Sequence, residues 1–141
     1  ISNFALKKEH GSYRSRHNSS YWQGIPYLGI GAAAHSYDID SRQWNVADIQ
    51  QYIQVIQRGE IPAEREFLTE DMRFDDTVTT ALRTNEGINL ASLTDHHRDY
   101  LMARAQKYIN QGLLTQEGEN IRLTKKGLFV SDSIMADFMY V

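Results

Sequence analysis

The sequence contains no cysteine among its 141 residues. Disulfides, thiol catalysis and clusters held by cysteine thiolates are therefore excluded within this chain. The sequence also lacks an apolar run approaching the roughly 18 to 20 residues that span a bilayer, and it shows no signal-peptide pattern. From these two absences we expect a cytoplasmic protein without a membrane segment.

A surplus of positive charge is also missing. Fifteen Lys and Arg residues stand against 18 Asp and Glu residues, and the formal net charge is −3. The whole chain therefore has no electrostatic attraction toward nucleic acid or acidic lipid. Hydrophobic residues make up 41% and charged residues 23%, as in a globular protein with a core. The chain opens on "ISNFAL" without Met, from which we expect a piece of a longer protein.

Two strands are predicted in the first 45 or so residues. "ISNFA" (1–5) reads as a short strand, and "YLGIGAAAHSY" (27–37) reads as a strand buried on both faces, with small residues where neighbours approach closely. Two strands do not form a stable sheet alone, so these belong to a larger α/β unit. In isolation, residues 1–45 are expected to self-associate or to be disordered.

An amphipathic helix is predicted next, capped by Asn45 and ended by Gly59 and Pro62. Its apolar positions follow the spacing i, i+3, i+4, i+7 and are Ile49, Tyr52, Ile53 and Ile56. The charged residues 59–68 are predicted to be a connector between the two halves.

The second half has the pattern of three helices, a hairpin and a last helix. The predicted elements are helices over 69–83, 88–93 and 95–111, strands over 113–116 and 121–124, and a helix capped by Thr124. This order is typical of a winged-helix domain.

A winged-helix domain often binds DNA through its third helix. Residues 98–126 carry six basic and three acidic side chains, a surplus that favours phosphate contacts. The tip of the wing, "QEGEN", instead carries Glu117 and Glu119, where a DNA-contacting wing would carry Lys or Arg. We therefore favour a packing or docking module, with a DNA-binding regulator as the alternative, and we expect no nucleic-acid partner.

The histidines are the candidate ligands. His96 and His97 are predicted on a solvated helix face, and His10 lies in a polar loop. His35 follows "GIGAAA" at the carboxyl end of the predicted buried strand, where α/β sheets and barrels place ligands. A buried, hydrogen-bonded histidine is the alternative at His35. The run "GIGAAA" lacks the third glycine of a dinucleotide-binding loop.

The stretch "SRHNSSYW" (15–22) contains the strongest candidate, His17. If residues 17–22 are helical, His17 and Tyr21 at i and i+4 share a face. A neutral imidazole is a good axial ligand of haem iron, and aromatic rings give apolar surface to a flat macrocycle. The alternative is a loop histidine that binds nothing, and the residues alone leave both possibilities open.

Six stretches in the same order resemble one family. They are "ISNFA", "SRHNSSYW", "YLGIGAAAHS", "RQWN", "ALRTNEGI" and "GLL…IRLTKKGLFVSDSIM". The sequence resembles the C-terminal part of radical SAM proteins related to oxygen-independent coproporphyrinogen III oxidase. The resemblance implies the last strands of a partial α/β barrel plus a linking helix in residues 1–60. It implies an α+β winged-helix domain in residues 61–141.

The resemblance also implies cofactors outside this chain. In the family, a preceding barrel binds a [4Fe-4S] cluster through CxxxCxxC, with S-adenosylmethionine on the unique iron. This chain has no cysteine, so it is expected to be inactive alone, and no catalytic residue is assigned to it. The resemblance carries cofactor contacts to Gly29, Gly31, Ala34 and His35. The oxidase has an apolar residue where His35 stands, so the match departs from the family there.

The motif at His17 distinguishes two branches of the family. The oxidases typically carry a "RNFQGYTT"-like stretch, whereas the HNxxYW form resembles the haem-chaperone (HemW-type) branch, in which it is associated with haem binding. His17, Asn18, Tyr21 and Trp22 match that motif, with His17 as the ligand of haem iron. The resemblance implies a protein that binds haem or porphyrin and passes haem to acceptor proteins. The alternative is a true oxidase of porphyrin biosynthesis, which converts two propionates of coproporphyrinogen III to vinyl groups.

Overall fold

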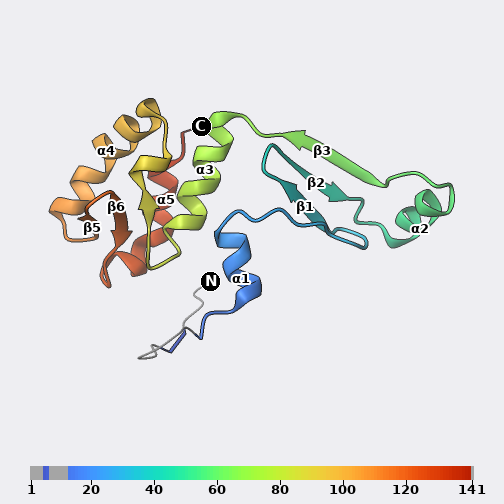
Figure 1. Ribbon diagram of the computed structural model, residues 1–141, viewed down its shortest axis with the longest axis horizontal. Helices are drawn as coiled ribbons and strands as arrows, with labels where there is room; N and C mark the ends of the chain where they lie inside the picture. Colours follow the sequence, from blue (N-terminus) through green and yellow to red (C-terminus); the bar gives the residue numbers. More distant parts are fainter. Residues whose placement is uncertain (1–4, 7–12, 141) are drawn as a thin grey trace. The chain divides into compact units, whose positions relative to one another are not determined.

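The computed structural model describes residues 5–6 and 13–140, and it divides into two compact units. The first unit is Ser15–Thr69. The second unit consists of the described residues from Glu70 onward together with the described N-terminal residues up to Arg14. Figure 1 labels the α-helices and most of the strands of both. Within the described ranges, no helix is both long enough and apolar enough to cross a membrane.

The first unit is a three-stranded antiparallel sheet with two helices. Its elements are α1 (Arg16–Trp22), β1 (His35–Asp38), β2 (Ser41–Asn45), α2 (Ile49–Gln57) and β3 (Ala63–Phe67), and the strand order is β1-β2-β3. Tyr37 of β1 lies opposite Arg42 of β2, which lies opposite Glu66 of β3. Tyr27 adds a single antiparallel bridge to Tyr37. The segment around Tyr27 and the strands β1, β2 and β3 therefore lie side by side at this position of the sheet.

The predicted buried strand over 27–37 is wrong. The chain turns between Gly31 and Ala34, with φ of 110° at Gly31 and 58° at Ala33, and β1 begins only at His35. Leu28 and Ile30 are 75% and 85% exposed. The buried Asn45 fixes the turn, because its Nδ2 donates to the Gly31 carbonyl at 2.8 Å. The other predicted strand, residues 1–5, lies almost wholly outside the described residues.

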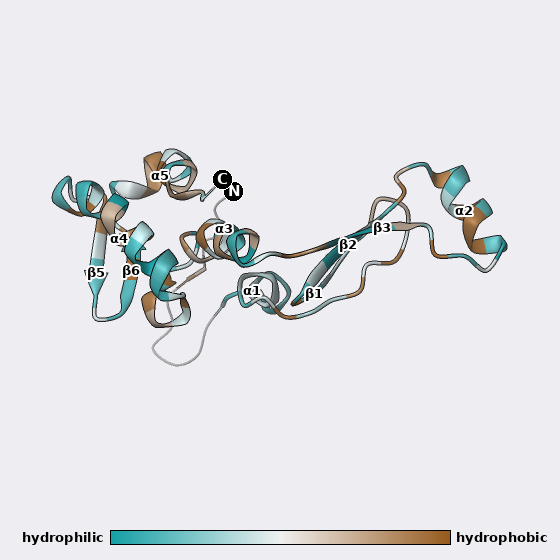
Figure 2. Cartoon of the chain, turned by 90° about the horizontal axis from the view of Figure 1, so that it is seen from above, coloured by the Kyte–Doolittle hydropathy of each residue, from teal (hydrophilic) through white to brown (hydrophobic). Residues whose placement is uncertain are grey.

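The predicted connector over 59–68 is also wrong, since β3 occupies half of it and pairs with β2. The helix before it is confirmed as α2, but its cap is Asp48, whose Oδ1 accepts from the Gln51 N–H at 2.7 Å. Asn45 instead ends β2. The three isoleucines of the predicted apolar stripe of α2 are exposed within this chain, as at Ile49 (65%), whereas Tyr52 is half-buried. Hydrophobic positions of α2 are brown in Figure 2.

The second unit combines helices with a small antiparallel sheet. Its elements are α3 (Glu70–Ala81), β4 (Ile88–Asn89), η1 (Leu90–Ser92), α4 (Asp95–Asn110), β5 (Leu114–Glu117), β6 (Asn120–Leu123), η2 (Gly127–Val130) and α5 (Ser131–Phe138), with strand order β4-β6-β5. Its core consists of buried apolar side chains from its helices and strands. The fully buried members include Val78, Leu82, Ile88, Leu101, Leu114, Ile121, Ile134 and Phe138.

The predicted helices over 69–83 and 95–111 and the predicted hairpin are confirmed. Helix α4 begins after Thr94 and spans the predicted range, and the hairpin turns at residues 117–120. The predicted helix over 88–93 is instead β4 followed by the single turn η1. The last helix begins later than predicted, as α5 after η2, and Thr124 instead accepts from the Gly127 N–H at 3.2 Å at the start of η2. The expected mixed α and β content is confirmed in both units.

Candidate functional site

The stretch "RHNSSYW" forms the helix α1, as the candidate site requires. Ser15 caps it by accepting from the Asn18 N–H at 3.3 Å, and Gly24 with φ of 63° lies just after its C-terminal end. None of its side chains is buried. The helix therefore presents its residues at the surface of the first unit.

His17 and Tyr21 share one face of α1, as their spacing predicts. Their ring centroids lie 4.9 Å apart, and the ring planes are inclined at 86°. The His17 side chain is exposed, and its imidazole forms no hydrogen bond within the described part of the chain. Asn18 and Trp22, also at i and i+4, are half-buried on a different face. The four motif residues are thus brought together on one helix but divided between two faces.

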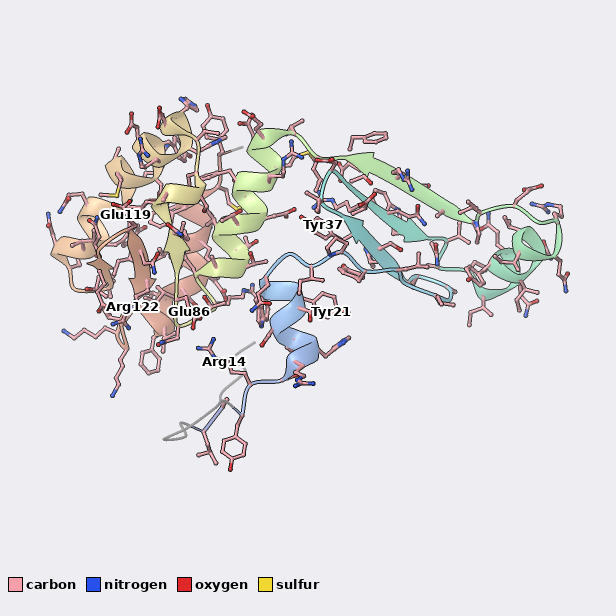
Figure 3. All side chains as sticks on the ribbon, viewed as in Figure 1. Arg14, Tyr21, Tyr37, Glu86, Glu119 and Arg122 are labelled. Atoms are coloured by element: carbon pink, nitrogen blue, oxygen red, sulfur yellow. The ribbon has the colours of Figure 1, made fainter. Side chains whose placement is uncertain are left out.

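Two further tyrosines continue the contact from Tyr21. The Tyr21 and Tyr27 centroids lie 4.9 Å apart at 86°, and those of Tyr27 and Tyr37 lie 6.3 Å apart at 32°. The backbones of Tyr27 and Tyr37 exchange two hydrogen bonds of 2.9 and 3.0 Å. We call His17, Tyr21, Tyr27 and Tyr37 the aromatic row; Figure 3 labels Tyr21 on α1 and Tyr37 on β1.

Sequence reasoning missed Tyr27 and Tyr37. Residues 27–37 read as one strand, whereas the bridge places two short segments of that range beside each other. Tyr21 and Tyr27 remain 40% and 37% exposed, so the row has ring surface available to a ligand. The only signal in the sequence was the density of tyrosines after His17.

The chemistry available at this site is that of a single imidazole beside aromatic rings. Within residues 5–6 and 13–140, no group of three or more His, Cys, Asp or Glu side chains is arranged to hold a metal ion. One imidazole suits a metal that already carries four in-plane ligands, as haem iron does. The neighbouring rings suit the flat apolar surface of a macrocycle.

The other predicted site residues lie in or beside the turn before β1, and His35 is the first residue of β1. The Gly29 N–H donates to Ser36 Oγ at 3.0 Å, and a Cβ at Gly29 would lie 2.1 Å from the His35 carbonyl oxygen. The Gly31 N–H donates to Tyr52 Oη at 3.2 Å, and the Ala34 carbonyl accepts from Asn45 at 2.9 Å. His35 is exposed, so the alternative of a buried histidine is wrong.

A second imidazole cluster lies in the second unit. His97 is only 4% exposed, so its predicted solvated position is wrong. Its ring stacks on Phe74 with centroids 4.6 Å apart at 10°, and its Nε2 lies 2.9 Å from Asp71 Oδ1. His96 contacts Tyr140 Oη at 2.7 Å. These contacts join α3, α4 and the C-terminal segment, which gives both histidines a structural role.

Charged side chains near the hairpin pair with one another. Asn85, Glu86, Glu117, Asn120 and Arg122 line a polar hollow, part of which Figure 3 labels. Burial opposes the ionisation of Glu86, but the Arg14 guanidinium at 2.8 Å outweighs it and lowers the pKa of Glu86. Arg122 pairs with Glu117. The hollow is thus occupied by ion pairs of the chain itself.

The basic residues counted for nucleic-acid binding are mostly engaged within the fold. Arg98 pairs with Asp95 at 2.5 Å, Lys107 pairs with Asp137 at 2.8 Å, and Arg104 lies 3.6 Å from the centroid of Tyr100. Together with the Arg122 pair, these contacts leave the surplus of positive charge at Lys125 and Lys126. Four of the six counted basic side chains therefore contact groups of the chain itself.

Comparison with known proteins gives one consistent family. Residues 68–130 match the HemN C-terminal domain family. The chain is 31% identical over 121 residues to the haem chaperone HemW of Mycobacterium tuberculosis (strain H37Rv), covering 85% of the chain and 30% of that protein. It is 26% identical over 144 residues to the haem chaperone HemW of Bacillus subtilis (strain 168), covering 99% of the chain and 37% of that protein. The chain thus spans about a third of the length of these curated relatives.

A solved structure shows the same fold. The coproporphyrinogen III oxidase HemN from Escherichia coli, described as a radical SAM enzyme, superimposes with a TM-score of 0.64 at 18% sequence identity. The match covers 89% of this chain and 34% of that one.

Proposed function

Because the chain resembles the C-terminal part of HemN- and HemW-type proteins, as its sequence predicts, we propose that it acts in haem binding and transfer, as part of a haem chaperone. The single observation that carries the proposal is the exposed His17 beside Tyr21 on α1, within the HNxxYW motif. His17 is the proposed axial ligand of the haem iron. Asn18, Tyr21 and Trp22 complete the proposed haem-binding set.

An open site suits transfer better than storage. The His17 imidazole is exposed and α1 contributes no buried side chain, so a haem bound there remains accessible to a second protein. The proposed partners are therefore haem and the proteins that accept it from this surface.

The proposal includes the architecture implied by the family. Residues 1–60 would supply the last strands of a radical SAM barrel with a linking helix, and residues 61–141 a winged-helix domain. In the complete protein, a [4Fe-4S] cluster would anchor and cleave S-adenosylmethionine. The cysteine ligands of that cluster must come from outside this chain, which has none. Gly29, Gly31, Ala34 and His35 are proposed to approach S-adenosylmethionine there.

A true oxidase is the second candidate, favoured by the likeness of the fold to HemN. The two candidates differ in one measurable product. Conversion of coproporphyrinogen III to protoporphyrinogen IX by the complete protein with its cluster and S-adenosylmethionine would establish the oxidase and refute the chaperone. Absence of product from a cluster-loaded preparation that binds haem would support the chaperone.

The direct test is a titration of the protein with haemin, followed by the Soret band. We expect the wild type and His35→Ala to bind alike, because His35 is an exposed histidine of the same unit that lies outside α1. His17→Ala should weaken binding by at least about tenfold, the effect of losing some 1.4 kcal/mol of ligand interaction. Equal binding by His17→Ala and the wild type would show that His17 is not the ligand.

A further inference from the structure

We propose that Tyr27 and Tyr37 are positioning residues of the haem site, which hold the Tyr21 ring as a stacking surface for the porphyrin macrocycle beside His17. This inference rests on the proposed function and extends the site beyond the HNxxYW motif. In this proposal the tyrosines of the aromatic row contact the flat apolar face of a tetrapyrrole or support that contact, and they do not bind its metal.

The orientation of the first two rings is the starting observation. An imidazole that binds haem iron axially stands perpendicular to the macrocycle plane. The Tyr21 plane is inclined at 86° to the His17 plane, with centroids 4.9 Å apart. Tyr21 can therefore lie parallel to a macrocycle ligated by His17 and present its face to it. Offset face-to-face stacking of this kind is a favoured arrangement of π-systems.

Tyr21 keeps this orientation only if another side chain packs against its ring. Helix α1 has seven residues and none of them is buried, so no fully buried side chain of its own anchors the helix. The edge-to-face contact of Tyr21 with Tyr27, with centroids 4.9 Å apart at 86°, supplies the support. Such an edge-to-face pair is itself a favoured aromatic geometry.

Tyr27 is in turn fixed by the sheet. Its backbone exchanges two hydrogen bonds with Tyr37 in β1, at 2.9 and 3.0 Å, and the two rings lie at 6.3 Å. Tyr37 Oη reaches back toward the end of α1, since a Cβ built on Gly24 would lie 3.8 Å from it. The row thus connects the imidazole on α1 to the hydrogen-bonded frame of β1.

The test separates stacking from ligation by using a porphyrin without iron. Metal-free protoporphyrin IX is titrated in parallel with haemin into the wild type, His17→Ala, Tyr21→Leu, Tyr27→Leu and Tyr27→Phe. We expect Tyr21→Leu and Tyr27→Leu to weaken the binding of both ligands about threefold to tenfold, the range of one aromatic contact. His17→Ala should weaken haemin alone. Tyr27→Phe keeps the ring and should bind like the wild type.

A double variant tests whether Tyr27 acts through Tyr21. If it does, Tyr21→Leu with Tyr27→Leu should bind metal-free porphyrin no more weakly than Tyr21→Leu alone. The matched control is Phe67→Leu, which removes a 73% exposed ring from β3 of the same unit and should change neither ligand. Additive losses, or wild-type binding by Tyr27→Leu, would overturn the inference and leave the role of His17 intact. Absence of binding of either ligand to the wild type would refute the proposed function and this inference together.

Discussion

Gly87 directly precedes β4 and lies against the backbone of β6, so its replacement by Ala tests the packing of the second unit. It has φ of 72°, and a Cβ there would lie 2.1 Å from the Ile121 carbonyl oxygen and 2.7 Å from Arg122 Cβ. Left-handed backbone costs a non-glycine residue about 1–2 kcal/mol. Forcing two packed strands apart costs about 1–3 kcal/mol more. Gly87→Ala should therefore lower the free energy of unfolding by about 2–5 kcal/mol.

Gly118→Ala is the matched control, because Gly118 has φ of 59° and open space where its Cβ would lie. Gly118→Ala should lower the free energy of unfolding only by the cost of left-handed backbone, about 1–2 kcal/mol. Both tryptophans belong to the first unit, so urea unfolding is followed by circular dichroism and by the backbone amide signals of Ile88 and Ile121. Equal losses in the two variants would refute the assignment of Gly87 to a close strand contact.

Two further perturbations concern polar contacts of the second unit. The Lys107 ammonium, 2.8 Å away, lowers the pKa of Asp137, so this pair should stabilise the fold above the ordinary carboxyl pKa of about 4 and cease to do so as the pH falls below it. Asp137→Asn should flatten that part of the pH–stability curve, and an unchanged slope from about pH 5 down to about pH 2 would contradict the role of the pair. Thr94→Val keeps the shape of the side chain but removes the cap on the His97 N–H, and thermal or urea unfolding should show a loss of about 1 kcal/mol. Unchanged unfolding would show that water replaces the cap.

The long helices and the hairpin of the second unit could be predicted because the sequence signals for them lie within a few residues of each other. Thr94 caps α4 three residues before His97, and the turn at Gly118 joins two adjacent strands. The position of His97 was not predictable. Its polar sequence neighbours indicate a solvated face, whereas its burial depends on Phe74 from another helix.

The first unit depends on contacts between distant residues. The turn at Gly31 is fixed by the side chain of Asn45, fourteen residues later, so the apolar run around Gly31 reads as a strand when taken alone. Strand β3 carries alternating charges, as at Glu64 and Arg65, because it is an edge strand, and this pattern imitates a connector. In the candidate site, the shared face of His17 and Tyr21 followed from helical spacing. The contact between Tyr21 and Tyr27 could not be predicted in this way, because it depends on the backbone pairing of Tyr27 with Tyr37 of β1.

The absence of buried side chains in α1 has a kinetic consequence. Helices without core contacts open at a small free-energy cost, well below that of global unfolding. The amide protons of α1 should therefore exchange with solvent faster than those around Leu101 in α4, which is fully buried. A metal ligand on such a helix can withdraw by unwinding the helix, while the sheet behind it stays intact. The residence time of anything held by His17 would then be set by how often α1 opens.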